Sequence, residues 1–363
     1  MIKPITMKIV FLLFALLLPV VKVHAQFTYT IANNQITITG EPNVPVNGVV
    51  TLPDTINGDP VVSIESYAFN GYYLTSVTIG TNVTQIGEFA FASCTSLTNI
   101  VIPNSVTSID DGVFVECGLT SITIPNSVTS LGGDVFVNCR QLASVTIGTN
   151  VPAIGTGVFE VCNSLTSLTI PNSVTSIGEG VFVNCANLTN VTIPNSVTAI
   201  GEEAFEYCPS LTSIVIPNSV TTFGTAVFYG CHSLTGVYFQ GNPPTPTNDL
   251  TGFIGDNNAV AYYLPGTMGW GSTFDGVPTV MWNPQAQTGD GRFGVLTNQF
   301  GFNITGSSNL VIVVEACTNL ANPFWTPVGT TTLNTFVGTN GTSYFSDPQW
   351  TNYSSRYYRF TSP

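Results

Sequence analysis

The chain has 363 residues, of which 44% are hydrophobic and only 7% are charged, against about 25% charged residues in an ordinary soluble domain. All three lysines lie in the first 22 residues, so the remainder carries four arginines against twenty acidic residues, a net charge of −16. Such a surface repels phosphate groups, which excludes binding to nucleic acid or to an anionic membrane.

Residues 1–25 have the pattern of a secretory signal peptide. Lys8 precedes an apolar run of thirteen residues, and Val23-His24-Ala25 leads up to Gln26. The run is too short to span about 30 Å of hydrocarbon, which takes roughly 20 residues, and no later stretch is as long. Because position 26 is not cysteine, a lipid-modified terminus is not expected. The sequence therefore predicts an exported chain, cleaved after Ala25, with no membrane span.

The chain repeats itself with a period of 23 residues, shortened once to 22. Periods of 20 to 50 residues indicate solenoids and related arrays. Eight segments share the step, the first starting at Leu74 and the last ending at Phe239. One position of the repeat is a cysteine in seven copies, which we interpret as a structural ladder: Cys94, Cys117, Cys139, Cys162, Cys185, Cys208 and Cys231.

Each repeat reads as one coil. In the copy that starts at Leu165, Leu168-Thr169-Ile170 alternates as a short strand does, and Pro171-Asn172-Ser173 ends it. Val174 to Ile177 is a second extended piece, and Gly180 to Asn184 is expected to form helical or 3₁₀ turns. Seven apolar residues cannot offset the ordering of 23, at about 1.5 kcal/mol each, so coils must stack to fold.

The consensus Cys-x-x-Leu-Thr-x-Val-Thr-Ile-Pro-Asn-Ser-Val-Thr-x-Ile-Gly-x-x-x-Phe resembles the 23-residue leucine-rich repeat of BspA-type bacterial surface proteins. The lead-in from Leu52 to Ile64 resembles it too, and the likeness covers about residues 49–239. The resemblance implies a right-handed leucine-rich solenoid at the cell surface. It also implies, by analogy of fold alone, adhesion or binding of other proteins, as reported for some members.

Five parts are predicted along the chain. They are a signal peptide (1–25), an N-terminal cap (26–73), a solenoid of eight repeats (74–239), a C-terminal cap (240–283) and a small β-sandwich (284–363). In the last part, residues 285–292 read as a polar linker. Strands are expected over residues 300–304, 310–316, 325–333, 343–346 and 356–360. The end of this part is similar to a terminal module of bacterial secreted repeat proteins. The fold class is thus a mainly β solenoid with a small β module.

The cysteines are expected to be buried free thiols. Residues at one repeat position stack about 4.8 Å apart, farther than the Cβ separation that a disulfide favours, and their side chains run parallel. Zinc is not expected, because CxxC pairs are absent and histidines are scarce. Calcium at acidic turns or around Asp256 and Asp290 stays an alternative, although no spaced calcium loop occurs. The sequence predicts no metal and no cofactor.

No catalytic residue is predicted. Cys231-His232 is the one adjacent cysteine and histidine, but Cys231 belongs to the ladder and His232 occupies a variable turn position. The acidic pairs Asp110-Asp111 and Glu202-Glu203 lie at turns, where solvated carboxylates are expected. The chain is therefore interpreted as a non-enzyme.

The outward face of the repeat strands is the candidate binding face, because a solenoid presents one row of side chains per repeat position. Its residues are Ser76, Thr78, Asn99, Ser121, Thr123, Ser144, Thr146, Ser167, Thr169, Asn190, Thr192, Ser213 and Tyr238. The face is either a solvated β surface or one that binds weakly through many copies. Hydroxyl rows that order water, as in ice-binding solenoids, are a more remote alternative.

The sequence therefore predicts a secreted or cell-surface protein that binds a protein or matrix partner outside the cell. An alternative is carbohydrate or cell-wall attachment through the terminal module, with the solenoid as a spacer. In that case aromatic side chains would stack on sugar rings: Trp325, Trp350, Tyr353, Tyr357 and Tyr358.

Overall fold

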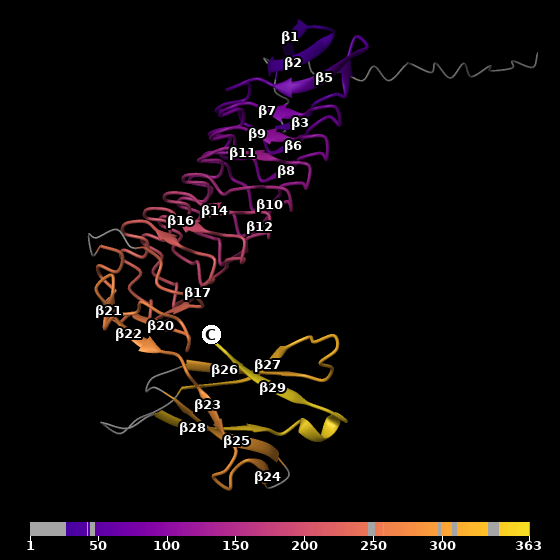
Figure 1. Ribbon diagram of the computed structural model, residues 1–363. Helices are drawn as coiled ribbons and strands as arrows, with labels where there is room; N and C mark the ends of the chain where they lie inside the picture. Colours follow the sequence, from indigo (N-terminus) through magenta and orange to yellow (C-terminus); the bar gives the residue numbers. More distant parts are fainter. Residues whose placement is uncertain are drawn as a thin grey trace, which may run out of the picture.

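The computed structural model describes residues 27–362 except 42, 44–47, 246–250, 257, 297–298, 307–310 and 333–340. These residues form a long β-solenoid that is followed by a small module of two sheets (Figure 1). The signal peptide predicted for residues 1–25 lies outside the described residues.

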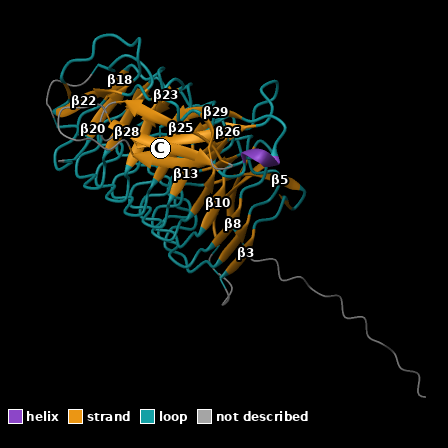
Figure 2. Ribbon diagram, turned by 90° about the horizontal axis from the view of Figure 1, so that it is seen from below, coloured by secondary structure: helices purple, strands orange, loops and turns teal. Residues whose placement is uncertain are grey.

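The first side of the solenoid, here called the strand face, is built from one short strand per coil. Strands of successive coils pair in parallel, so that Ser121 lies opposite Ser144 and Thr123 opposite Thr146. Figure 2 shows these strands stacked in a row, with loops and turns along the other side. They are β3 (Val49–Thr51), β6 (Ser76–Thr78), β8 (Asn99–Val101), β10 (Ser121–Thr123), β12 (Ser144–Thr146), β13 (Ser167–Thr169), β15 (Asn190–Thr192), β17 (Ser213–Ile216), β19 (Gly236–Phe239), β20 (Val260–Tyr263) and β22 (Val277–Met281).

The second side consists mostly of two-residue strands, which follow the Pro-Asn-Ser turn of each coil. They pair in parallel as well, as Ser176 does with Ala199. At the N-terminal end the longer strands β2 and β5 join this side, and β1 adds to it in antiparallel fashion. The strands are β1 (Thr28–Ala32), β2 (Gln35–Gly40), β5 (Asp59–Ile64), β7 (Gln85–Ile86), β9 (Ser108–Ile109), β11 (Ser130–Leu131), β14 (Ser176–Ile177), β16 (Ala199–Ile200) and β18 (Thr222–Phe223). Two short strands, β4 (Thr55–Ile56) and β21 (Thr273–Phe274), pair antiparallel at the two ends.

The third side is a stack of hydrogen-bonded turns. The sequence prediction of helical turns was wrong for the described repeats, whereas single turns of the 3₁₀ type are present. Val183 and Cys185 donate to the carbonyl groups of Gly180 and Phe182, three residues earlier, each at 3.1 Å. The N–H groups of Gly180, Phe182 and Asn184 donate instead to carbonyl groups of the next coil, each at 2.9 Å. Gly180 and Asn184 have φ angles of 62° and 58°, in the left-handed region that a right-handed helix excludes. Because only alternate N–H groups donate within the segment, no continuous helix forms.

Two columns of side chains fill the interior. Phenylalanine rings of successive coils, from Phe69 to Phe228, stack with centroids 5.1 to 5.8 Å apart. Beside them, each ladder cysteine donates its S–H to a phenylalanine carbonyl group of a preceding coil, at 3.0 to 3.3 Å. All eight cysteines are buried and none forms a disulfide. The thiols thus act as small apolar groups whose one donor is satisfied.

The segment at residues 241–283 breaks the sequence period, yet it continues the strand face. Tyr238 of β19 pairs with Tyr262 of β20, which in turn pairs with Val280 of β22, all in parallel. The parallel pairing of the strands therefore continues past the residue at which the sequence repeat ends.

The C-terminal module has two small antiparallel sheets. In one, β25 pairs with β23, β24 and β28, and in the other β26 lies between β27 and β29. The five strands predicted here are confirmed as β25–β29. The interpretation of residues 285–292 as a linker was wrong at its start, because β23 pairs with β25. The elements are β23 (Gln285–Gln287), β24 (Gly294–Leu296), β25 (Gln299–Gly306), β26 (Val311–Cys317), β27 (Thr326–Thr332), β28 (Gly341–Asp347), the 3₁₀ turn η1 (Trp350–Asn352) and β29 (Tyr357–Thr361).

The turn column before each cysteine yields a test of backbone strain. Val161 holds φ at 58°, which is costly for a β-branched residue, whereas Asn184 holds the same angle one coil later. We expect Val161→Asn to raise the free energy of unfolding by about 1 kcal/mol, and Asn184→Val to lower it by a similar amount. Urea denaturation of both variants measures this, and a loss of stability in Val161→Asn contradicts it.

The ladder yields a second test. Burial raises the pKa of Cys94, Cys139 and Cys185 to about 12, so thiolate is scarce at pH 8. We expect the native protein to react negligibly with a thiol reagent, and all eight cysteines to react after denaturation without reductant. A count of four or fewer in the denatured protein would mean disulfides and overturn the ladder.

Candidate functional site

The candidate binding face lies on the strand face, where the parallel register aligns its side chains in straight rows. Ser167 lies opposite Asn190, and Thr169 opposite Thr192. The residues between them point inward, as Leu168 does at 3% exposure. Ten of the predicted residues are exposed: Thr78, Asn99, Ser121, Thr123, Ser144, Thr146, Ser167, Thr169, Asn190 and Thr192. Ser76 and Ser213 are half-buried.

Threonine hydroxyl groups beside the rows form hydrogen bonds within the protein, whereas the exposed hydroxyl groups of the rows do not. Thr189 and Thr235, which precede their strands, donate to carbonyl oxygens of the preceding coil at 3.0 and 3.1 Å. Among the described residues, none of the ten exposed row residues has a side-chain hydrogen bond to the chain. Their hydroxyl and amide groups are therefore open to solvent or to a partner.

Tyr238 does not belong to the open face, because it is only 5% exposed. Its ring stacks on that of Tyr262 at 4.8 Å. Both rings share an apolar cluster with Phe302 and Ile304 of the C-terminal module, against which Val215 also packs. The module thus covers the end of the strand face (Figure 1).

A signal for this contact was present in the sequence but was missed. The outer row that carries Thr169 and Thr192 changes to Val215 and then Tyr238. Adjacent apolar residues on an outward face indicate a covered surface. The polar part of the row, which the exposed Val101 interrupts once, ends at Thr192. The open face therefore comprises the coils from β6 to β15.

The structure does not bring catalytic groups together at the cysteine and histidine. The Cys231 thiol is buried and donates to the Phe205 carbonyl group, whereas the His232 ring is exposed and its Nδ1 lies 3.1 Å from the Gly255 carbonyl oxygen. Because that oxygen only accepts, Nδ1 carries the proton. The two side chains serve separate contacts.

The acidic pairs lie at turns on the third side. Asp110 accepts hydrogen bonds from Gln85 and Ser108, and Asp111 accepts one from the Gly133 backbone at 2.7 Å. Glu203 holds a left-handed φ of 56°. In the described part of the chain, no group of three or more histidine, cysteine or acidic residues could hold a metal ion. Within that part, no helix has the length and apolarity needed to cross a membrane.

The aromatic residues of the C-terminal module do not form one platform. Tyr353 and Tyr357 are exposed at 41% and 40%. Trp325 lies under the Arg359 guanidinium at 4.6 Å, and Tyr358 stacks on Phe300 at 5.3 Å. The Arg356 guanidinium also lies 4.2 Å from the centroid of the Tyr353 ring. At least three of the five rings thus serve internal contacts.

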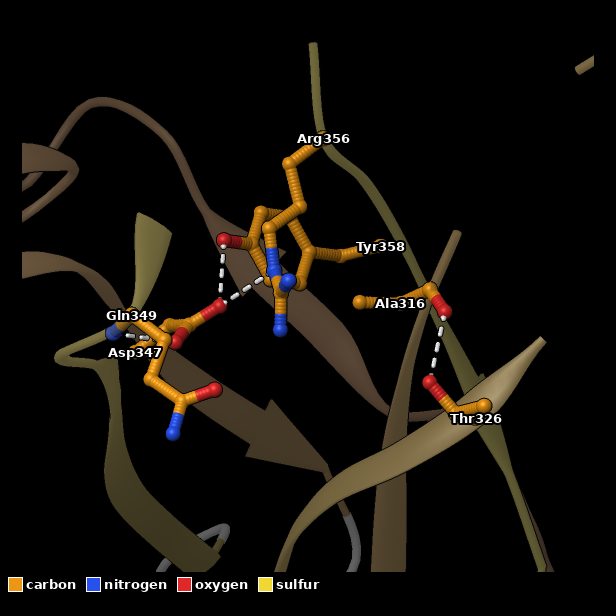
Figure 3. Close-up of polar contacts among 6 residues, drawn as sticks. All are labelled: Ala316, Thr326, Asp347, Gln349, Arg356 and Tyr358. Carbon is orange, nitrogen blue, oxygen red and sulfur yellow. Dashed lines mark hydrogen bonds and ion pairs between the residues drawn. The ribbon is translucent and has the colours of Figure 1, made fainter. Parts of the chain in front are cut away.

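A buried carboxylate fixes this part of the module. Asp347, which is 3% exposed, pairs with the Arg356 Nε at 2.5 Å. It also accepts hydrogen bonds from the Tyr358 hydroxyl group and the Gln349 backbone, at 2.9 and 2.8 Å (Figure 3). Three donors offset the desolvation of the carboxylate and hold β28 to β29.

The repeat region matches the family model described as the BspA type leucine-rich repeat region, in six copies over residues 62–167 and 152–245. A leucine-rich repeat protein from Bacteroides ovatus has a similar structure, with 29% identity, a TM-score of 0.52, and coverage of 65% of this chain and 69% of that one. The leucine-rich repeat protein of T. pallidum is 31% identical with a TM-score of 0.43, covering 57% and 87%. A leucine-rich cell surface protein from Faecalibacterium prausnitzii is 25% identical with a TM-score of 0.41, covering 66% and 88%. Among curated proteins none matches.

One buried carboxyl group yields a test by pH. Asp256 is 2% exposed, its carboxylate oxygens have no hydrogen-bond partner among the described residues, and burial raises its pKa to about 7. The folded state therefore binds its proton more tightly than the unfolded state, whose pKa is about 3.9. We expect this group to lower the free energy of unfolding as the pH rises from about 4 to about 7.

In Asp256→Asn that part of the pH dependence is expected to vanish, and the variant is expected to be more stable than the parent at pH 8. Urea midpoints at pH 4.5, 6 and 8 measure both effects. If the urea midpoints of the parent and of Asp256→Asn changed with pH in parallel, Asp256 would not be the group responsible for this pH dependence.

Proposed function

This chain belongs to the BspA-type leucine-rich repeat family, and we propose that it is an exported binding protein without catalytic activity. Its open strand face contacts a protein or matrix partner outside the cell. The observation that carries the proposal is the run of exposed serine, threonine and asparagine side chains on β6 to β15, which only Val101 interrupts, at 57% exposure. None of these exposed polar side chains is bonded within the described chain.

The chemistry of the face defines the kind of partner. No lysine, arginine or acidic residue occurs in the two rows, so long-range steering by charge is weak there. Scattered aromatic and arginine anchors, which dominate ordinary interfaces, are lacking in the rows between Thr78 and Thr192. Affinity must then come from many similar contacts, which favours an extended or repetitive partner.

Export is proposed on two grounds. The pattern of residues 1–25 is that of a secretory signal, and the −16 charge of the remainder suits a surface that stays clear of anionic lipid. Catalysis is not proposed, because the buried Cys231 and exposed His232 serve separate structural contacts.

Attachment to carbohydrate through the C-terminal module is the second candidate. The exposed rings of Tyr353 and Tyr357, at 41% and 40%, favour it. These rings lie on the module and away from the open part of the strand face, so variants separate the two functions.

The test uses the full chain on arrays of extracellular proteins and glycans. Thr146→Arg places a long charged side chain in the middle of the open face, where Thr146 is exposed. We expect it to weaken binding to the protein partner by at least about tenfold. Thr129→Arg is the matched control, since Thr129 is exposed just before β11 on the second side.

Equal binding by the parent and Thr146→Arg contradicts a role for the strand face. Loss of binding in Tyr357→Ala alone, with glycans as the ligands, favours the second candidate instead. Circular dichroism of every variant establishes that the fold is retained.

A further inference from the structure

A hollow of about 540 Å³ lies on the turns that flank the cysteines, apart from the open strand face. It crosses five coils, which at about 4.8 Å per coil makes it about 19 Å long. Residues from two repeat columns line it, those before and those after each cysteine: Arg140, Val161, Asn163, Asn184, Ala186, Tyr207, Pro209, Gly230 and His232.

The hollow brings together two residue types that are rare in this chain. Arg140 is the one lysine or arginine between residues 26 and 291, and His232 is the one histidine beyond residue 24. They occupy the same variable column of the repeat, in coils at opposite ends of the hollow. The repeat consensus does not fix the residues of this column, so the hollow has a chemistry of its own.

Among the described residues Arg140 has no acidic partner, although seventeen acidic residues lie between 26 and 283. Its Nη2 donates to the Asn138 side-chain carbonyl at 3.2 Å. The ion pairs found among the described residues both lie in the C-terminal module, at Arg356 and Arg359. The guanidinium at the end of the hollow is therefore available to a carboxylate from outside, which it can bind through two parallel hydrogen bonds.

Tyr207 is held in place within the hollow. It is 42% exposed, and its backbone has a left-handed φ of 52°. Its ring lies over Gly230, where a Cβ would come within 2.6 Å of a ring carbon. Tyr229 packs against it edge-on with centroids 5.4 Å apart. The glycine thus permits, and the second tyrosine supports, a fixed aromatic platform.

The backbone around the hollow is already paired. The N–H groups of Val161, Asn184 and Tyr207 donate to the next coil at 2.8 to 2.9 Å. An extended peptide bound by strand addition needs free backbone groups, so a ligand here must be recognised by side chains. An aromatic ring, the amides of Asn163 and Asn184, and one guanidinium suit a ligand rich in hydroxyl groups.

Acidic residues near the hollow limit the charge of that ligand. Burial, together with the charges of Asp134 and Glu203, raises the pKa of Glu160, and burial with Glu203 and Glu160 raises that of Glu206. Glu160 and Glu206 each precede a residue that lines the hollow. A polyanion would be repelled there. A single carboxylate at Arg140 lies at the far end from Glu206 but one coil from Glu160, so its attraction to the guanidinium must exceed the repulsion by Glu160.

We propose that this hollow binds an oligosaccharide that carries a single acidic sugar. The sugar carboxylate pairs with Arg140, and a pyranose ring farther along the oligosaccharide stacks on Tyr207, three coils or about 14 Å away. The asparagine amides between them bond to hydroxyl groups. The site is separate from the strand face, so it stands or falls independently of the protein partner proposed above.

The test compares sialyllactose, which has one carboxylate, with lactose, which has none. Titration calorimetry and saturation-transfer NMR on the full chain are expected to detect binding of sialyllactose, with a dissociation constant of up to about 10 mM. The dissociation constant for lactose is expected to be at least about tenfold higher. Binding is expected to weaken as salt rises, because the contact is an ion pair near the surface.

Two variants use residues that the fold already accepts in the same columns. Arg140→Asn places the residue found at 163, and Tyr207→Asn the residue found at 138 and 184, both of which hold left-handed angles. Each is expected to lower the affinity for sialyllactose by at least about tenfold. Thr95→Asn and Ser93→Asn are the matched controls, since they make the same change in the same columns outside the hollow.

Unchanged affinity in both variants, or no binding of sialyllactose by the parent, overturns the proposal. Equal affinity for lactose and sialyllactose overturns the role of Arg140. Loss of sialyllactose binding in Tyr357→Ala, with binding by Arg140→Asn unchanged, would place the saccharide on the C-terminal module and overturn the proposal. If a glutamate-containing peptide bound in the hollow and the saccharide did not, an oligosaccharide would be excluded as the ligand.

Discussion

The fold depends on one constraint: a coil of 23 residues cannot bury its own apolar side chains, so each coil must present them to a neighbour in the same register. Parallel hydrogen bonds on all three sides meet this constraint. On the turn side they alternate with bonds within the turn, since Phe182 donates to Ala204 of the next coil and Val183 to Gly180 of its own, so single turns form in place of a helix. Every inward position then becomes a column, and the stacked phenylalanine rings and satisfied thiols follow from that geometry.

The outer surface inherits the same register. Because side chains alternate along each strand, an inward Leu168 sets Ser167 and Thr169 outward, and stacking turns them into rows. Such rows offer many equal contacts and few strong ones. In the proposed function they favour a partner that is itself extended, and the two rows contain no carboxylate, imidazole or thiol side chain.

Departures from the repeat are more informative than the repeat itself. Val215 and Tyr238 replace threonine where the C-terminal module covers the strand face. Arg140, Tyr207 and His232 are residue types that occur once in two variable columns of the repeat, where a hollow opens on the turns. In the first place the departure serves packing within the chain, and in the second it leaves a cation and an aromatic ring facing outward without an internal partner for the charge.

The sequence alone determined the solenoid, the inward cysteines and phenylalanines, and the strands of the terminal module, because period and alternation are local properties that can be counted. It also placed Thr146 and Asn190 on an outward face. The tertiary structure decided what lies against what: that Tyr238 is covered, that Gln285 begins a paired strand rather than a linker, and that Arg140 and His232 border one hollow. The partners of Tyr238 and Gln285 lie at separations that follow no period, because they belong to the C-terminal module. Arg140 and His232 are a whole number of periods apart, but whether the turns between them leave a hollow depends on how the side chains pack.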